Sequence, residues 1–89
     1  MKISEKKKQK IAEQILLYLY STNPKPLFTS HIAEEIARDE EFIKKMLLEL
    51  KEKKLVVEIK KNSEGYEYVR RSRWKLSNQV YVFYKKNQN

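Results

Sequence analysis

The sequence predicts a mainly helical α+β fold, and the spacing of its apolar residues is the first reason. Apolar residues recur at steps of three and four along 5–20 and again along 32–50, which gives each helix one apolar face. Strand-like runs follow at 55–61 and 66–76, on either side of a turn that holds the chain's only glycine. We therefore expect a three-helix core with a short first strand, a two-stranded hairpin and a C-terminal helix.

The first helix is expected at 5–20. Ser4 precedes it as a candidate N-cap, and a turn containing both prolines of the chain ends it. The apolar residues that repeat at four along it are Ile11, Ile15 and Leu19. Tyr18 and Tyr20 widen this apolar surface beyond one stripe. One face can therefore meet the core while another meets a second subunit.

A pair of helices joined by a tight turn is expected next. The elements predicted here are a short strand at 27–29 and helices at 30–37 and 40–53. Thr29 or Ser30 is expected to cap the first helix and Asp39 the second, because short polar side chains accept hydrogen bonds from free amides of a first turn. The apolar face of the second helix consists of Phe42, Ile43, Met46, Leu47 and Leu50. This arrangement predicts a helix-turn-helix.

The last segment, 78–86, allows two structures. Its run of Val80 to Tyr84 has high strand propensity, and as a strand it would extend the hairpin sheet or pair with a second chain. Ser77 is, however, a good N-cap, and in a helix Val80, Phe83 and Tyr84 share one face. Of the two, we expect the helix.

Two runs of residues match a known pattern without a gap: Ile32-Ala33-Glu34-Glu35-Ile36 and Leu47-Leu48-Glu49-Leu50-Lys51-Glu52-Lys53-Lys54-Leu55-Val56. On these residues the chain resembles the winged helix-turn-helix family of small archaeal and bacterial transcriptional regulators. In that family the second helix of the helix-turn-helix, called the recognition helix, ends in L-K-E-L-E-E-K-G-L, and a two-stranded wing follows it. Arg73-Trp74-Lys75-Leu76-Ser77 is similar to the closing strand and the start of a last helix. The resemblance covers roughly residues 8–86, and it is more specific for fold than for function, since winged helices also bind RNA and proteins.

The resemblance implies double-stranded DNA as the partner, with the recognition helix in the major groove and the wing on the backbone or minor groove. The side chains that it places towards bases are Glu40, Glu41, Lys44, Lys45 and Leu48. The start of the preceding helix adds Ser30 and His31. The wing adds Lys60, Lys61, Arg70, Arg71 and Arg73, because arginine suits phosphates and narrow minor grooves.

Several of these residues also have a purely structural interpretation. Glu40 and Glu41 repel phosphates, although a carboxylate can accept from a cytosine amino group, and both residues favour the positive end of a helix. His31 is expected in a surface or capping role, and a charged wing can be a solvated edge hairpin protected from aggregation. Trp74 is expected in the core or between the wing and the last helix, and not as a base-stacking platform.

Composition excludes several classes of protein. Eighty-nine residues predict one domain, 1–89. The absence of cysteine excludes disulfides and thiolate metal sites, and a single histidine excludes a histidine-rich site, so no metal and no cofactor are expected. No nucleophile–base set and no glycine-rich phosphate loop are present, which argues against an enzyme. No apolar run approaches the ~20 residues of a membrane span, so we expect a soluble cytoplasmic protein.

The charge favours a polyanionic partner. The formal net charge is +8 and the pI is about 9.7. Abundant lysine, glutamate and isoleucine without cysteine also suit a thermophile, which offers another origin for the basic surface.

Two functional hypotheses follow. The first is a sequence-specific DNA-binding regulator that acts as a homodimer. Its subunits would meet through residues near Ile11, Tyr18, Tyr20, Val80, Tyr81 and Tyr84. The second is a protein-interaction winged helix, a module or small subunit of a larger assembly, favoured by the acidic start of the recognition helix and by Leu48.

Overall fold

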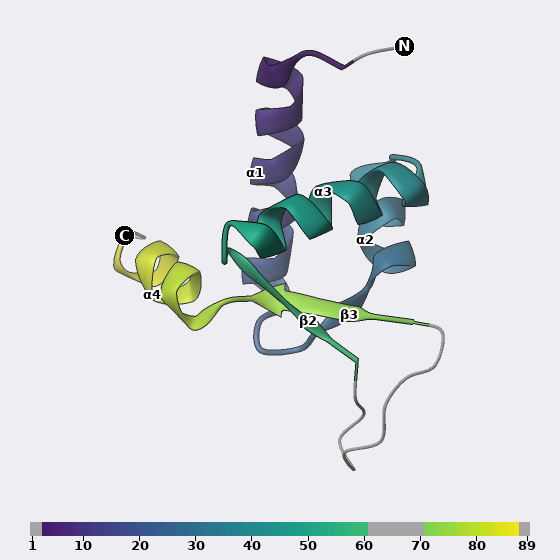
Figure 1. Ribbon diagram of the computed structural model, residues 1–89. Helices are drawn as coiled ribbons and strands as arrows, with labels where there is room; N and C mark the ends of the chain where they lie inside the picture. The colour runs from purple at the N-terminus through teal and green to yellow at the C-terminus, as the bar shows by residue number, and fades with distance from the viewer. Residues whose placement is uncertain (1–2, 61–70, 88–89) are drawn as a thin grey trace.

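The computed structural model describes residues 3–60 and 71–87, in which three helices pack together over a small antiparallel sheet and a fourth follows its central strand (Figure 1). The elements in chain order are α1 (Glu5–Thr22), β1 (Leu27–Phe28), α2 (Thr29–Ile36), α3 (Glu40–Glu52), β2 (Val56–Ile59), β3 (Arg73–Leu76) and α4 (Asn78–Lys86). Each predicted helix is present, and no end differs by more than two residues from the one expected. Among the described residues, no helix has the length and apolarity that crossing a bilayer requires.

The sheet has the strand order β1-β3-β2, with both pairs antiparallel. Trp74 of β3 lies opposite Leu27 of β1 on one side and opposite Glu58 of β2 on the other. Among the described residues, five that were expected in strands lie outside them: 29, 55, 60, 71 and 72. Leu55 stays outside β2 because its amide donates to the Leu50 carbonyl at 2.9 Å, which keeps it part of the turn that ends α3. The expected hairpin turn, 62–65, lies outside the described residues.

The core confirms the helical stripes. Its fully buried side chains come from α1, α2, α3 and β3: Ile15, Leu19, Ile32, Ile43, Leu47, Trp74 and Leu76. Trp74 lies in this core, as the sequence predicts, and its indole N–H donates to the Thr29 hydroxyl at 2.9 Å. A buried indole needs such an acceptor, so this bond ties the sheet to the start of α2.

The helix starts confirm three predicted caps and overturn a fourth. Ser4, Asp39 and Ser77 each accept from the amide three residues on, at 3.2 to 3.3 Å. The prediction that Thr29 or Ser30 caps α2 is wrong. Phe28 holds the cap position and makes no side-chain cap bond, while Thr29 is already in the first turn. The Thr29 hydroxyl instead accepts a hydrogen bond from the Trp74 indole N–H.

A residue with left-handed backbone follows each of α2 and α3. Ala37 follows α2 with φ 62° and ψ 47°, and its amide donates to the Glu34 carbonyl at 3.2 Å. Lys54 follows α3 with φ 63°. The resembled family pattern has glycine at the position of Lys54, and glycine adopts this conformation without the steric cost that a Cβ imposes.

The C-terminal segment is a helix, as expected, and it packs on the end of α1. The Tyr20 ring lies 5.5 Å from the Tyr81 ring and 5.6 Å from the Tyr84 ring. Of the residues expected to share a face, Val80 and Tyr84 pack against the core, whereas Phe83 is 62% exposed. Tyr81 takes the inward position because the helix is rotated so that two tyrosines meet Tyr20.

Candidate nucleic-acid interface

The outward face of α3 carries the side chains that the resemblance placed towards bases. Five of them, Glu40, Glu41, Lys44, Lys45 and Leu48, are exposed. The opposite face holds the buried side chains of Ile43, Met46, Leu47 and Leu50. The apolar stripe fixes the rotation of the helix, so the polar face is held towards solvent. An exposed helical face of this kind is what a major groove admits.

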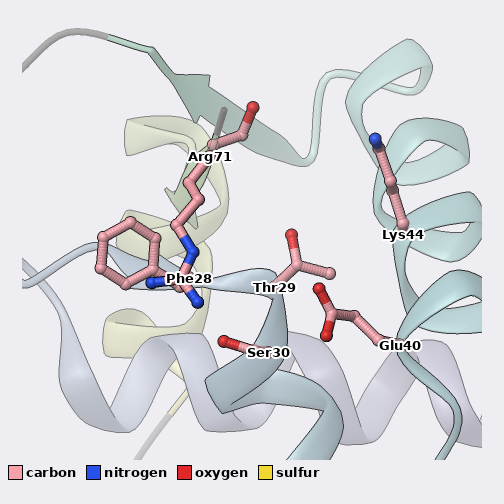
Figure 2. Close-up of a pocket in the computed structure, with 7 residues that line it drawn as sticks. Phe28, Thr29, Ser30, Glu40, Lys44 and Arg71 are labelled. Carbon is pink, nitrogen blue, oxygen red and sulfur yellow. The ribbon is translucent and has the colours of Figure 1, made fainter. Parts of the chain in front are cut away.

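A pocket of ≈ 90 Å³ lies where the starts of α2 and α3 meet the segment that leads into β3 (Figure 2). Its lining residues are Phe28, Thr29, Ser30, Glu40, Lys44, Arg71 and Ser72. Four of the predicted site residues, Ser30, Glu40, Lys44 and Arg71, therefore come together from three segments far apart in sequence. Two cations and one carboxylate give the pocket a net positive charge, which suits a phosphate group.

Arg71 enters this pocket over an aromatic ring. Figure 2 shows its side chain reaching Phe28 on one side, with Glu40 and Lys44 on α3 at the other. The guanidinium carbon lies 5.0 Å from the ring centroid, a cation–π contact. His31 meets the same ring edge-on, with 5.7 Å between ring centroids. Phe28 was not predicted as a site residue, because its apolar character and strand position indicate only a packing role.

Glu58 connects the sheet to α3. It pairs with Lys51 at 2.8 Å, and it accepts a hydrogen bond from the Ser72 hydroxyl. Burial, which leaves this side chain 9% exposed, raises the pKa of the Glu58 carboxyl, but the hydrogen bonds from Lys51 and Ser72 outweigh it and hold the pKa below 4.5. No spacing rule in the sequence joins residues 51, 58 and 72, so this group of side chains was not predicted.

The remaining predicted residues lie apart from the pocket or outside the described residues. Lys60 is exposed beyond the end of β2, and His31 is exposed on the first turn of α2. Arg73 is half-buried on β3, opposite Phe28 and Ile59. Lys61 and Arg70 lie outside the described residues. Across the part of the chain that is described, no cluster of histidine, cysteine or acidic side chains is placed to hold a metal ion.

No protein-family profile and no curated protein matches the chain. Solved structures do match. A variant of ZitR from Lactococcus lactis has a TM-score of 0.70 at 20% sequence identity, over 97% of this chain and 54% of its own. MepR of S. aureus in complex with DNA has a TM-score of 0.68 at 23% sequence identity, over 84% of this chain and 60% of its own. The transcriptional regulator PcaV of Streptomyces coelicolor has a TM-score of 0.64 at 18% sequence identity, over 90% of this chain and 54% of its own.

All three are winged-helix proteins, and their chains superimpose on most of the present one. The chain has the winged helix-turn-helix fold. In the terms of this fold, α2 and α3 are the helix-turn-helix, α3 is the recognition helix, and β2 and β3 are the strands of the wing. The mainly helical α+β class expected from the sequence is confirmed. The chain spans 54% to 60% of the length of these structures.

The side chains expected between subunits of this winged helix mostly pack within one chain. Ile11 itself is 2% exposed in the core, so its side chain is not available to a second subunit. The others, Tyr18, Tyr20, Val80, Tyr81 and Tyr84, are half-buried and pack against that core. Burial, reinforced by the negative charge of Glu13, raises the pKa of the Tyr84 hydroxyl. The large apolar side chains that α1 and α4 leave exposed are instead Leu17, Val82 and Phe83.

Proposed function

We propose that this winged helix binds double-stranded DNA with sequence preference and regulates transcription. The recognition helix α3 would enter the major groove through its exposed face, and the wing would contact the backbone or the adjacent minor groove. The observation that carries the proposal is the pocket that joins Ser30, Glu40, Lys44 and Arg71. Support also comes from a matched structure, MepR, which was solved with DNA bound.

The proposed roles divide between base contact and backbone contact. On α3, Lys44, Lys45 and Leu48 are exposed and are proposed to contact base edges. Glu40 and Glu41 are proposed to accept from cytosine amino groups. Ser30 and His31 at the start of α2 are proposed to contact phosphate. On the wing side, Arg71 and Lys60 are proposed to contact phosphate or the minor groove, together with Lys61, Arg70 and Arg73. We also propose that residues 1–89 act as one domain.

The direct test compares two double variants that remove the same charge. Lys44→Ala with Lys45→Ala takes two exposed lysines from the recognition helix, whereas Lys85→Ala with Lys86→Ala takes two exposed lysines from the end of α4. Duplexes selected from a random DNA library would be titrated at two or more salt concentrations. We expect the first variant to bind more weakly and its salt slope to fall by about 0.9 for each phosphate that it no longer neutralises. The second should retain selectivity.

Equal losses of affinity in the two double variants would mean that binding depends only on net charge. Selectivity that survives moderate salt in the unaltered protein would establish sequence reading, because contacts with base edges carry the sequence information whereas phosphate contacts do not. Binding that ignores sequence and disappears with salt would contradict the proposal.

We further propose that the regulator is a homodimer, since two recognition helices one helical turn apart read two half-sites. The exposed apolar side chains on α1 and α4 support it. Val82 is 49% exposed on α4, and Val57 is 41% exposed on β2. The same substitution at both, valine to serine, separates a subunit contact from general surface effects. Sedimentation analysis should show a weaker dimer for Val82→Ser and an unchanged one for Val57→Ser.

A second candidate function is docking to another protein. Leu48 is 42% exposed on the recognition helix, and it lines an open groove with Glu49, Lys51 and Glu52. An apolar side chain among charges suits a protein partner better than phosphate. Binding through this groove should tolerate salt and be abolished in Leu48→Ser, whereas DNA binding should weaken steeply with salt.

A further inference from the structure

Phe28 contacts Arg71, a cation that the family resemblance places in contact with DNA. Phe28 is the last residue of β1, and its backbone is paired with Arg73 in the sheet. The Arg71 guanidinium carbon lies 5.0 Å from the centroid of the Phe28 ring. The His31 ring lies nearly perpendicular to the Phe28 ring, with 5.7 Å between ring centroids. The Phe28 ring is half-buried and lines the pocket between α2, α3 and the base of the wing.

We propose that Phe28 is a positioning residue, which holds the Arg71 guanidinium at the pocket between α2 and α3 ready to bind a DNA phosphate. This inference rests on the proposed function. A guanidinium that stacks on a ring uses its flat face, so the N–H groups along its edge remain available as donors. A phosphate can therefore bind to that edge without displacing the ring.

The contact with the ring also holds Arg71 on the side of the pocket away from a carboxylate, Glu40. Glu40 lies on the opposite wall of the same pocket, and an ion pair between the two would neutralise the cation and close the site (Figure 2). Between these two described residues there is no ion pair, whereas Lys8 pairs with Glu49 and Lys51 with Glu58. Arg71 is thus held on the ring and apart from the carboxylate. The arrangement also reduces the rotamer freedom that an exposed arginine would lose on binding.

The test compares Phe28→Leu, which stays apolar but has no π face, with Phe28→Tyr, which keeps one. Affinity for a fluorescein-labelled random-sequence duplex would be measured by anisotropy in both variants, in Arg71→Ala, and in Arg71→Ala combined with Phe28→Leu. We expect Phe28→Leu to weaken binding by about three-fold and Phe28→Tyr to bind as the unaltered protein does. The combined variant should bind no more weakly than Arg71→Ala alone, because Phe28 acts through Arg71.

A structural role for Phe28 would give a different result. If Phe28→Leu and Arg71→Ala weakened binding independently, so that their free-energy losses added, the positioning role would be refuted. The same conclusion follows if Phe28→Tyr binds as weakly as Phe28→Leu. Thermal unfolding of each variant checks that the fold is kept.

A measurement without DNA separates this inference from the proposed function. In the free protein, the Phe28 ring current should shift the NMR signals of the Arg71 δ protons upfield, and Phe28→Leu should abolish that shift. Duplex binding without the ring-current shift would overturn the positioning role alone. A ring-current shift in a protein that binds no duplex would overturn the proposed function, and with it the role in DNA binding assigned to Phe28.

Discussion

The left-handed conformation of Ala37 predicts that a glycine there stabilises the protein. Ala37 links α2 to α3 with φ 62° and ψ 47°. In this region the Cβ of an L-residue approaches the following carbonyl oxygen at a cost of about 1–2 kcal/mol. Glycine removes that cost, but its greater freedom in the unfolded chain offsets about 0.4–1 kcal/mol. Ala37→Gly should therefore raise the free energy of unfolding by about 0.5–1 kcal/mol.

The matched control is the same substitution within a helix. Ala12 lies in α1 and is packed against the core, where glycine costs about 0.5–1 kcal/mol relative to alanine before any loss of packing. Urea titration followed by circular dichroism measures both variants. For a domain of this size, Ala37→Gly should raise Tm by about 2–8 °C, and Ala12→Gly should lower it. A loss of stability in Ala37→Gly similar to that in Ala12→Gly would refute the reasoning.

Three further predictions concern Lys54, Thr29 and Glu58. Lys54→Gly should also stabilise, by about 0.5–1 kcal/mol in urea titration, because Lys54 has φ 63°; an unchanged or lower value would contradict this. Thr29→Val should destabilise by about 1–3 kcal/mol, since the buried Trp74 indole loses its acceptor, and Thr29→Ser, which keeps the hydroxyl, is the control. The third prediction concerns pH. The pKa of Glu58 is lowered in the folded state, so its contribution is complete above the ordinary value of 4.5 and is lost as the pH falls through the lowered pKa. Glu58→Gln should therefore be less stable than the unaltered protein at pH 7, and the difference should shrink in acid; a constant difference down to about pH 2 would count against it.

Local sequence patterns were enough to predict the helices. The stripe of Ile11, Ile15 and Leu19 and the caps Ser4 and Asp39 depend only on neighbours within one or two turns, and the structure confirms them. The C-terminal helix was the harder choice, because its β-branched and aromatic run favours a strand by propensity. The Ser77 cap and the packing of the helix on Tyr20 outweigh that propensity.

The features that the sequence did not predict depend on contacts between distant segments. Thr29 looks like a cap until Trp74, 45 residues away, takes its hydroxyl as an acceptor. The outward place of Phe83 depends on which rings of α4 meet Tyr20. The approach of Arg71 to Phe28 depends on the sheet register, which brings β3 beside β1. Periodicity and capping carry no information on such pairs.

The carboxylate of Glu58 has a mechanical consequence for the proposed DNA complex. It forms an ion pair with Lys51 at the end of the recognition helix and also accepts a hydrogen bond from Ser72 at the base of the wing. The carboxylate therefore links those two parts and restrains their separation. Where a duplex has grooves spaced differently, the DNA must twist or bend to meet both, and the energy of that deformation varies with the base steps involved. The protein would then discriminate between sequences at base pairs that it never touches.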